Sequence, residues 1–232
     1  MAVEIEVLKS IPYFLGLSTA ELEAVKKHVF EQMVEKNDMI IMEGDPANAV
    51  YFVVSGAVKV FKTSVEGKEQ ILCILKPGES FNDIAVFDGG PNPASAIAMT
   101  PVLLYAINKS SMEAILREYP NLAANVIRIL SKKVRHFVSL VEDLSFRRVT
   151  DRLAKLLLEY ATDHGPIGEQ DRARPRLTQQ EMAAVVGTAR EVVGRSLKAL
   201  EEEGAIRMDR HRIVIVNKKR LKQISGVGAG AV

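Results

Sequence analysis

Two arginines and a glutamate lie close together near the start of one predicted helix, as Arg190, Glu191 and Arg195. An arginine guanidinium can donate two parallel hydrogen bonds to O6 and N7 of guanine, and a glutamate can accept one from N4 of cytosine. The apolar residues of the same segment recur at helical spacing and mark its buried side: Val192, Val193, Leu197 and Leu200. The three charged side chains then share the exposed side, where a helix lying in the major groove reads base edges.

A second, shorter helix precedes this one, so the two predict a helix-turn-helix. Thr178 followed by Glu181 indicates a capping box, which satisfies backbone donors at a helix start. Gly187 supplies the turn, and Thr188 is expected to cap the second helix. Glu191 has a competing role, because it follows Thr188 by three residues and could complete a second cap. A helix hairpin with a solvated charged face is the alternative for the whole segment.

Two short apolar runs after the second helix predict a β-hairpin, with strands at 205–208 and 213–216. A hairpin behind a helix-turn-helix has the arrangement of a wing, and its turn at 209–212 is basic. Basic side chains at a wing tip can meet phosphates, which fix the register on DNA. A solvated loop is the alternative. The residues that we expect at the DNA backbone are Thr178, Thr188, Arg210 and Arg212.

The composition is that of a soluble globular protein, with 47% hydrophobic and 26% charged residues among 232. The net charge of +2 is unevenly distributed, because from Ser145 onward Lys and Arg exceed Asp and Glu by six. A basic C-terminal part suits a nucleic-acid partner. No apolar run is long enough to cross a membrane and no signal pattern opens the chain. We therefore expect a cytoplasmic protein without a membrane partner.

Short alternating segments separated by turn residues occupy the first half of the chain and predict a compact antiparallel β-barrel or roll. A capping box at Ser18 and Glu21 opens a short helix before them. A barrel of this size can hold one small ligand. Cys73 is interpreted as a buried strand residue, since a single cysteine cannot form a disulfide within the chain. The predicted strands are 29–34, 39–42, 50–54, 57–63, 69–75 and 95–107.

Apolar residues recur in four-three spacing after Pro120 and predict a long helix with a dimer seam. The seam residues are Ala123, Ile127, Leu130, Val134, Phe137, Val141 and Leu144. A long helix packed only on its own domain is the alternative, because further apolar residues broaden this face. A dimer would also explain how one short recognition helix suffices, since two copies read paired half-sites. Ser145-Phe146 marks the expected hinge, followed by an amphipathic helix at 149–160.

This order of elements resembles the Crp/Fnr family of bacterial transcription regulators over nearly the whole chain. The features that carry the resemblance are Gly44, Gly56, Gly78, the hinge region 143–151 and the motif GTAREVVGR at 187–195. The resemblance implies an α+β fold in three parts. These are an N-terminal cyclic-nucleotide-binding-like β-roll (a jelly-roll barrel) at 1–120, a long dimerisation helix at 121–144, and a winged helix-turn-helix at 145–232.

The resemblance also implies a function. Arg190 and Arg195 would contact guanines, and Glu191 a cytosine amino group, in a TGTGA-type half-site. The implied partners are double-stranded DNA, RNA polymerase, a small-molecule effector and a second copy of the chain. No nucleophile–base pair or metal-ligand spacing stands out in the sequence, so we expect neither enzymatic activity nor a metal site.

The effector side departs from the family's cyclic AMP pattern, which has Gly-Glu for the ribose and Arg-Ser for the cyclic phosphate. Here the first pair aligns with Asn82-Asp83, and the second falls in 92–95, which has no arginine. The positions that would meet the adenine are Phe137-Val138. We therefore expect an effector other than cyclic AMP, or a pocket filled by its own side chains in a ligand-independent regulator. The residues expected around the pocket are Phe81, Asn82, Asp83, Ile84, Ser95, Phe137 and Val138.

The sequence leaves the cofactor open. The family's iron–sulfur members carry an N-terminal cysteine cluster, and this chain has none, so no iron–sulfur cluster is expected. Haem-based gas sensing is the alternative function. Of the four histidines only His136 lies on the long helix near the expected pocket. Because it falls off the seam beside Arg135, a solvated or interhelical histidine is the preferred interpretation.

Overall fold

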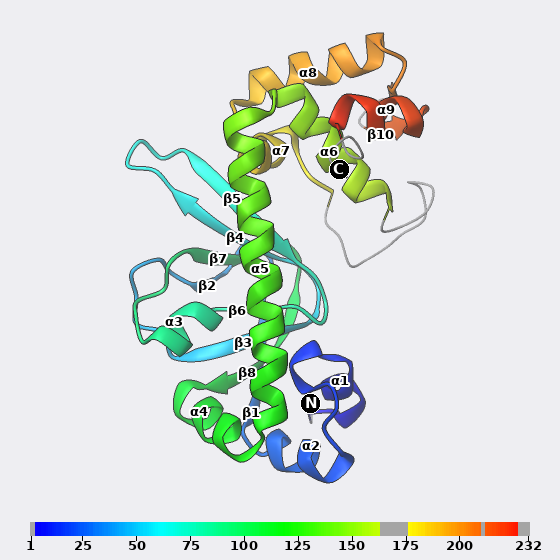
Figure 1. Cartoon of the computed structure of the whole chain (residues 1–232). Helices are drawn as coiled ribbons and strands as arrows, with labels where there is room; N and C mark the ends of the chain where they lie inside the picture. The colour runs from blue at the N-terminus through cyan, green and yellow to red at the C-terminus, as the bar shows by residue number, and fades with distance from the viewer. Residues whose placement is uncertain (1–2, 163–175, 210–211, 227–232) are drawn as a thin grey trace. The chain divides into compact units, whose positions relative to one another are not determined.

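The structure, a computed structural model, describes residues 3–162, 176–209 and 212–226 (Figure 1). The chain divides into two compact units, each with its own hydrophobic core. Of the described residues, the first unit holds 3–64 and 72–137, and the second holds 65–71, 138–162 and 176–226. The predicted mixture of a strand-rich first half and a helical second half is confirmed.

Two four-stranded sheets form the framework of the first unit, in the orders β1-β8-β3-β6 and β2-β7-β4-β5, and the start of β5 (69–71) belongs to the second unit. Val53, Val58 and Leu104 belong to a core cluster contributed by both sheets. The sheets place sequentially distant strands side by side, because β8 pairs with both β1 and β3. The strands are β1 (Val29–Val34), β2 (Met39–Ile41), β3 (Ala49–Ser55), β4 (Val58–Thr63), β5 (Glu69–Leu75), β6 (Ser80–Phe81), β7 (Ser95–Ala98) and β8 (Val102–Asn108).

The single strand predicted at 95–107 is wrong, because the structure divides it into β7 and β8. Pro101 lies at the break, and a proline cannot donate a hydrogen bond to a strand ladder. Gly56 faces this break with a φ of +84°, and a Cβ there would collide with the carbonyl oxygen of Pro101. The close approach of the two backbones explains the glycine at position 56.

Short helices complete the first unit and gather around the first turns of the long helix α5 (Figure 1). The capping box predicted at Ser18 and Glu21 is confirmed at the start of α2. The rings of Tyr13, Phe14 and Phe52 contact one another in the core beside them. Helix α3 was not predicted. The helices are α1 (Ile5–Ser10), a 3-10 turn (Pro12–Phe14), α2 (Thr19–Lys26), α3 (Asp83–Asp88) and α4 (Lys109–Glu118).

The long predicted helix is confirmed as α5 (Pro120–Phe146), followed by α6 (Val149–Thr162). The hinge predicted at Ser145-Phe146 is wrong, because both residues are helical and the break falls at Arg147-Arg148. The helix runs two residues beyond the predicted end at 144, and Asp143 stabilises this end. It forms an ion pair with Arg147 one turn later at 2.8 Å and another with Lys155 of α6 at 2.5 Å. Both pairs lie in the second unit.

The second unit contains the predicted helix-turn-helix and hairpin. Helix α6 contacts α7, α8 and α9, and Figure 1 shows these helices around it. Their shared core includes Leu153, Val193 and Leu221. Among the described residues, no helix is both long and apolar enough to cross a lipid bilayer. The elements are α7 (Gln179–Val186), α8 (Arg190–Glu202), β9 (Ile206–Asp209), β10 (Arg212–Ile215) and α9 (Lys218–Ser225), the last of which was not predicted.

Candidate DNA-binding surface and effector pocket

The charged residues singled out on α8 lie on its exposed face. Arg190, Glu191 and Arg195 are exposed, whereas the apolar residues expected on the opposite side include the buried Val193 and Leu197. Successive residues of a helix are about 100° apart around its axis. The three charged residues and Lys198 therefore share a face that spans roughly 140° of α8. Lys198 is exposed and was missed in the sequence, where only the helix's first turns were considered.

Gly194 lies in the middle of the same face. A glycine inside a helix lowers its stability by about 1 kcal/mol relative to alanine, so the presence of glycine here requires an explanation. Here the nearest atom to an added Cβ is the Oε1 of Gln179 at 3.9 Å, and packing therefore does not demand glycine. The missing side chain leaves the backbone of α8 open to a close approach between the flanking charged residues. This arrangement suits a helix that lies in a groove.

The two predicted caps have different outcomes. The capping box of Thr178 and Glu181 is confirmed, with the Glu181 N–H donating to Thr178 Oγ1 at 3.1 Å. The cap predicted at Thr188 is wrong, because the residue before α8 is Ala189 and no side chain caps this helix. The Thr188 N–H instead donates to Ala183 O and closes the end of α7 after Gly187, whose φ is +70°. Glu191 therefore has no Thr188 cap with which it could form a capping box.

The predicted wing is present as the antiparallel pair β9 and β10. Arg212 begins β10 and pairs with Asp209, so both residues belong to the strands and not to the predicted turn. Arg210 lies outside the described residues, and Arg212 is exposed. Phosphate contacts by the four predicted backbone residues stay predictions. Exposed basic residues that were missed include Arg207 on β9, and Lys218, Lys219 and Lys222 on α9.

Helix α5 presents two apolar stripes, displaced from each other by one residue along the sequence. One stripe packs into the first unit's own core and includes Leu122, Val126 and Ile129. The other coincides with the predicted seam, and within this chain it is largely uncovered. Ile127, Val134 and Val141 are 65%, 60% and 63% exposed, while Leu130 and Phe137 are partly buried. Ala123 is also partly buried, and Leu144 and Val138 are exposed.

Asp83, expected in the effector pocket, lies in a buried polar network of the first unit. Its Oδ1 accepts hydrogen bonds from the hydroxyls of Tyr13 and Ser80, and its Oδ2 pairs with the Lys133 ammonium of α5. Lys133 also donates to the Ser80 carbonyl at 2.8 Å. Burial, followed by the charge of Asp83, raises the pKa of Tyr13, so its hydroxyl remains a donor. The network holds α5, β6 and the 3-10 turn together.

Replacing Lys133 with methionine is expected to destabilise the protein by about 1–3 kcal/mol, because the buried Asp83 carboxylate loses its counter-charge. Urea unfolding at a fixed protein concentration measures this change. The matched control is Lys132→Met at the neighbouring exposed position, which should leave the unfolding midpoint nearly unchanged. Equal midpoints for the two variants would mean that the ion pair contributes nothing measurable.

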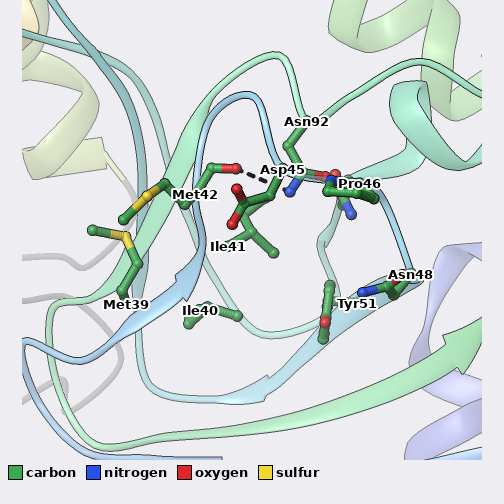
Figure 2. A pocket seen from close by; sticks show the side chains of 10 residues that line it. Met39, Ile40, Ile41, Met42, Asp45, Pro46, Asn48, Tyr51 and Asn92 are labelled. Atoms are coloured by element: carbon green, nitrogen blue, oxygen red, sulfur yellow. Dashed lines mark hydrogen bonds between the residues drawn. The ribbon is translucent and has the colours of Figure 1, made fainter.

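A pocket of about 370 Å³ opens in the first unit beside this network (Figure 2). Of the predicted pocket residues, only Asn82 lines it. Ile84 is 45% exposed, and Ser95 is buried with its Oγ accepting from the Glu43 N–H at 3.0 Å. Phe81 is buried and stacks on Tyr51. The lining residues are Met39, Ile40, Ile41, Met42, Asp45, Pro46, Asn48, Tyr51, Asn82 and Asn92.

His136 and Cys73 have structural partners in the first unit. The Nε2 of His136 lies 3.0 Å from the Leu72 carbonyl oxygen, with which it can share a hydrogen bond when that nitrogen carries the proton. Burial raises the pKa of the Cys73 thiol to about 12, so the reactive thiolate is scarce at neutral pH. Within the described ranges, no group of three His, Cys, Asp or Glu side chains could hold a metal ion.

An exposed helix face with arginine and glutamate side chains in a winged helix-turn-helix, joined to a β-roll, defines a type of DNA-binding regulator. Residues 31–119 match the family described as the cyclic nucleotide-binding domain, and residues 151–224 match the Crp-like helix-turn-helix domain. The chain belongs to the Crp/Fnr family of bacterial transcription regulators. The predicted fold class and the prediction of a DNA-binding transcription regulator are both confirmed.

Similar proteins cover nearly the whole chain. The cyclic AMP receptor protein of Thermus thermophilus is 31% identical over 219 residues, which are 94% of this chain and 98% of that protein. A CRP-like cAMP-activated global transcriptional regulator of Mycobacterium tuberculosis is 29% identical over 217 residues, 93% of this chain and 97% of that protein. Among solved structures, FixK2 from Bradyrhizobium japonicum has a TM-score of 0.73 and 25% identity, covering 84% of this chain and 96% of FixK2.

Proposed function

We propose that the chain acts as a homodimer that reads a TGTGA-type palindrome and regulates transcription from it. The observation that carries this proposal is the exposed face of α8, where Arg190, Glu191 and Arg195 have no core role. Arginine and glutamate supply the hydrogen-bonding groups that guanine and cytosine edges require. The basic residues of the wing and α9 add phosphate contacts that position this helix.

The exposed stripe on α5 supports the proposed dimer. A soluble protein seldom leaves a continuous row of valine and isoleucine side chains in water. Ile127, Val134 and Val141 repeat at seven-residue intervals, which is the period of a two-helix coiled coil. A second copy of α5 covers the stripe without demanding any change in the first unit's own core. Two copies then present two recognition helices to paired half-sites.

The effector is proposed to differ from the cyclic AMP that the names of both relatives carry. A cyclic phosphate needs a cationic or strongly donating partner when it leaves water. None of the residues lining the pocket is a lysine or arginine, and Lys62 nearby pairs with Glu43 at 2.7 Å. Asp83, the counterpart of the ribose-binding glutamate, is already occupied by three side chains. Recruitment of RNA polymerase by the DNA-bound dimer is the proposed route to regulation.

Cyclic AMP is accordingly expected to bind more weakly than about 100 µM, because an unmade charge-assisted contact costs one to two tenfold steps in affinity. Isothermal titration calorimetry measures this directly, with the Thermus thermophilus relative as the positive control. Micromolar binding of cyclic AMP, coupled to tighter DNA association, would contradict the proposed effector class. It would leave the DNA-binding proposal intact.

The DNA-binding proposal is tested by titrating the purified protein into three duplexes at fixed salt. These carry a TGTGA-type palindrome, one half-site alone, and a scrambled sequence of the same composition. The palindrome should bind at least tenfold more tightly than the single half-site, because both recognition helices are then engaged. Equal affinity for all three duplexes would show that the protein only neutralises phosphates.

A further inference from the structure

The polar side of the pocket consists of one carboxylate and three amides. Asp45 contributes a carboxylate, which lies in the middle of the view in Figure 2, and Asn48, Asn82 and Asn92 contribute amides. No lining residue carries a positive charge. A ligand that binds here therefore meets negative charge and carbonyl-type oxygens. This set disfavours anions and favours molecules with N–H donors.

Two of the amides have a fixed orientation. The Nδ2 of Asn82 donates to Ala49 O at 3.1 Å, and the Nδ2 of Asn92 donates to Met42 O at 3.0 Å. Flipping either amide would place its oxygen against a carbonyl oxygen, which is unfavourable. The Oδ1 atoms are therefore the ones without a hydrogen-bond donor. Both Oδ1 atoms are buried and accept no hydrogen bond from the described residues. Asn92 as a whole is only 4% exposed.

Buried acceptors without donors are unfavourable, and native proteins contain few of them. Two such oxygens in residues that line one pocket indicate that a donor is missing from the unliganded state. Met39 and Met42 form part of the rim and are 44% and 53% exposed. Methionine side chains are unbranched and adapt readily, so the rim can move to admit a ligand. We infer that such a movement exposes the two buried oxygens to the N–H groups of a ligand.

The remaining side of the pocket is apolar and aromatic. Ile40, Ile41 and the two methionines provide hydrocarbon and thioether surface. Tyr51 lines the opposite side in Figure 2, and its ring is stacked on Phe81 with centroids 5.0 Å apart. A stacked ring held in one orientation is a platform for an apolar group or for a cation above its face. The pocket thus combines an acceptor-rich side with an apolar side.

We propose that this pocket binds a small organic ammonium compound: a primary amine attached to an aromatic or branched apolar group. The ammonium lies against Asp45 and donates to the Asn82 and Asn92 oxygens, and the apolar group lies between Tyr51 and the methionine rim. The volume of about 370 Å³ suits a molecule of this size. This assignment rests on the proposed function, since it names the effector class of the same β-roll.

The test compares amines with carboxylates of similar shape. The probes are tyramine, tryptamine and 3-methylbutylamine, set against 4-hydroxyphenylacetate, indole-3-acetate and 4-methylpentanoate. Each is titrated calorimetrically into the full-length protein. At least one amine should bind with a Kd below about 1 mM, and its carboxylate counterpart should bind at least tenfold more weakly. Absence of binding by all three amines, or equal binding within the pairs, overturns the proposal.

Asp45→Asn keeps the shape of the pocket and removes its charge, so amine affinity should fall about fivefold. Asp38→Asn is the matched control, because Asp38 is exposed and does not line the pocket. If Asp45→Asn leaves the amine affinity unchanged, the ligand binds elsewhere and the assignment is overturned. DNA titration and sedimentation on the same preparation separate the two proposals. If the protein binds DNA specifically but binds no amine, only the proposed ligand class is contradicted. If it binds an amine but binds no DNA sequence specifically, only the proposed function is contradicted.

Discussion

Replacing Arg190 or Arg195 with alanine will weaken binding to a TGTGA-type palindrome by about 1–3 kcal/mol for each half-site, or about 2–6 kcal/mol for a dimer that carries two altered helices. Both side chains are exposed on α8. Each arginine that pairs with a guanine makes two hydrogen bonds that no other base reproduces. The loss should therefore be concentrated at the guanine positions of the half-site.

Nonspecific binding should weaken much less, because it depends on phosphate contacts distributed over the wing and α9. Titration of each variant into specific and scrambled duplexes at one salt concentration separates the two effects. Arg117→Ala on α4 is the matched control, since Arg117 is exposed in the other unit and lies outside the recognition helix. If specific and scrambled duplexes lose equal affinity, the two arginines only neutralise phosphate.

We expect that replacing Val134 with aspartate will convert the proposed dimer to a monomer and abolish binding to the proposed palindrome. Val134 is 60% exposed within one chain, so the new carboxylate leaves the first unit's core intact. In the dimer, two such carboxylates would face each other in a dry seam without counter-charges, which is strongly unfavourable. Leu130→Asp should also dissociate the dimer, but Leu130 packs partly on its own core and its substitution will also cost stability.

Sedimentation velocity measures the dimer directly, and thermal unfolding confirms that the variant chain is folded. Lys132→Asp is the control on the same helix, because position 132 is exposed and lies off both apolar stripes. It should leave sedimentation unchanged. A Val134→Asp protein that still sediments as a dimer would move the interface away from α5.

The helix-turn-helix could be predicted because its signals are local. Thr178 and Glu181 fix the start of α7, Gly187 requires a left-handed backbone, and the apolar spacing of α8 identifies its buried face. The long helix was predictable for the same reason. Short-range chemistry decides these features, and the sequence displays it directly.

Features that depend on distant contacts were not predictable. Thr188 resembles a cap in sequence, but its backbone N–H is taken by Ala183 at the end of α7. Asp83 was assigned to the pocket because it aligns with the family's ribose-binding position. Only the tertiary fold brings Tyr13 and Lys133 to its carboxylate. Helix α9 had weak local signals, namely a cap at Asn217 and the buried Leu221, and its packing on α6 supplies most of its stability.

Selection of bound sequences from a library of random duplexes tests the central claim most directly, because it assumes no target. We expect enrichment of an inverted repeat with TGTGA-type half-sites whose centres lie about one helical turn apart, roughly 10 base pairs. The Val134→Asp protein should enrich no such repeat. Recovery of unpaired single motifs by the unaltered chain, or of sequences with no shared motif, would contradict palindrome recognition by a dimer.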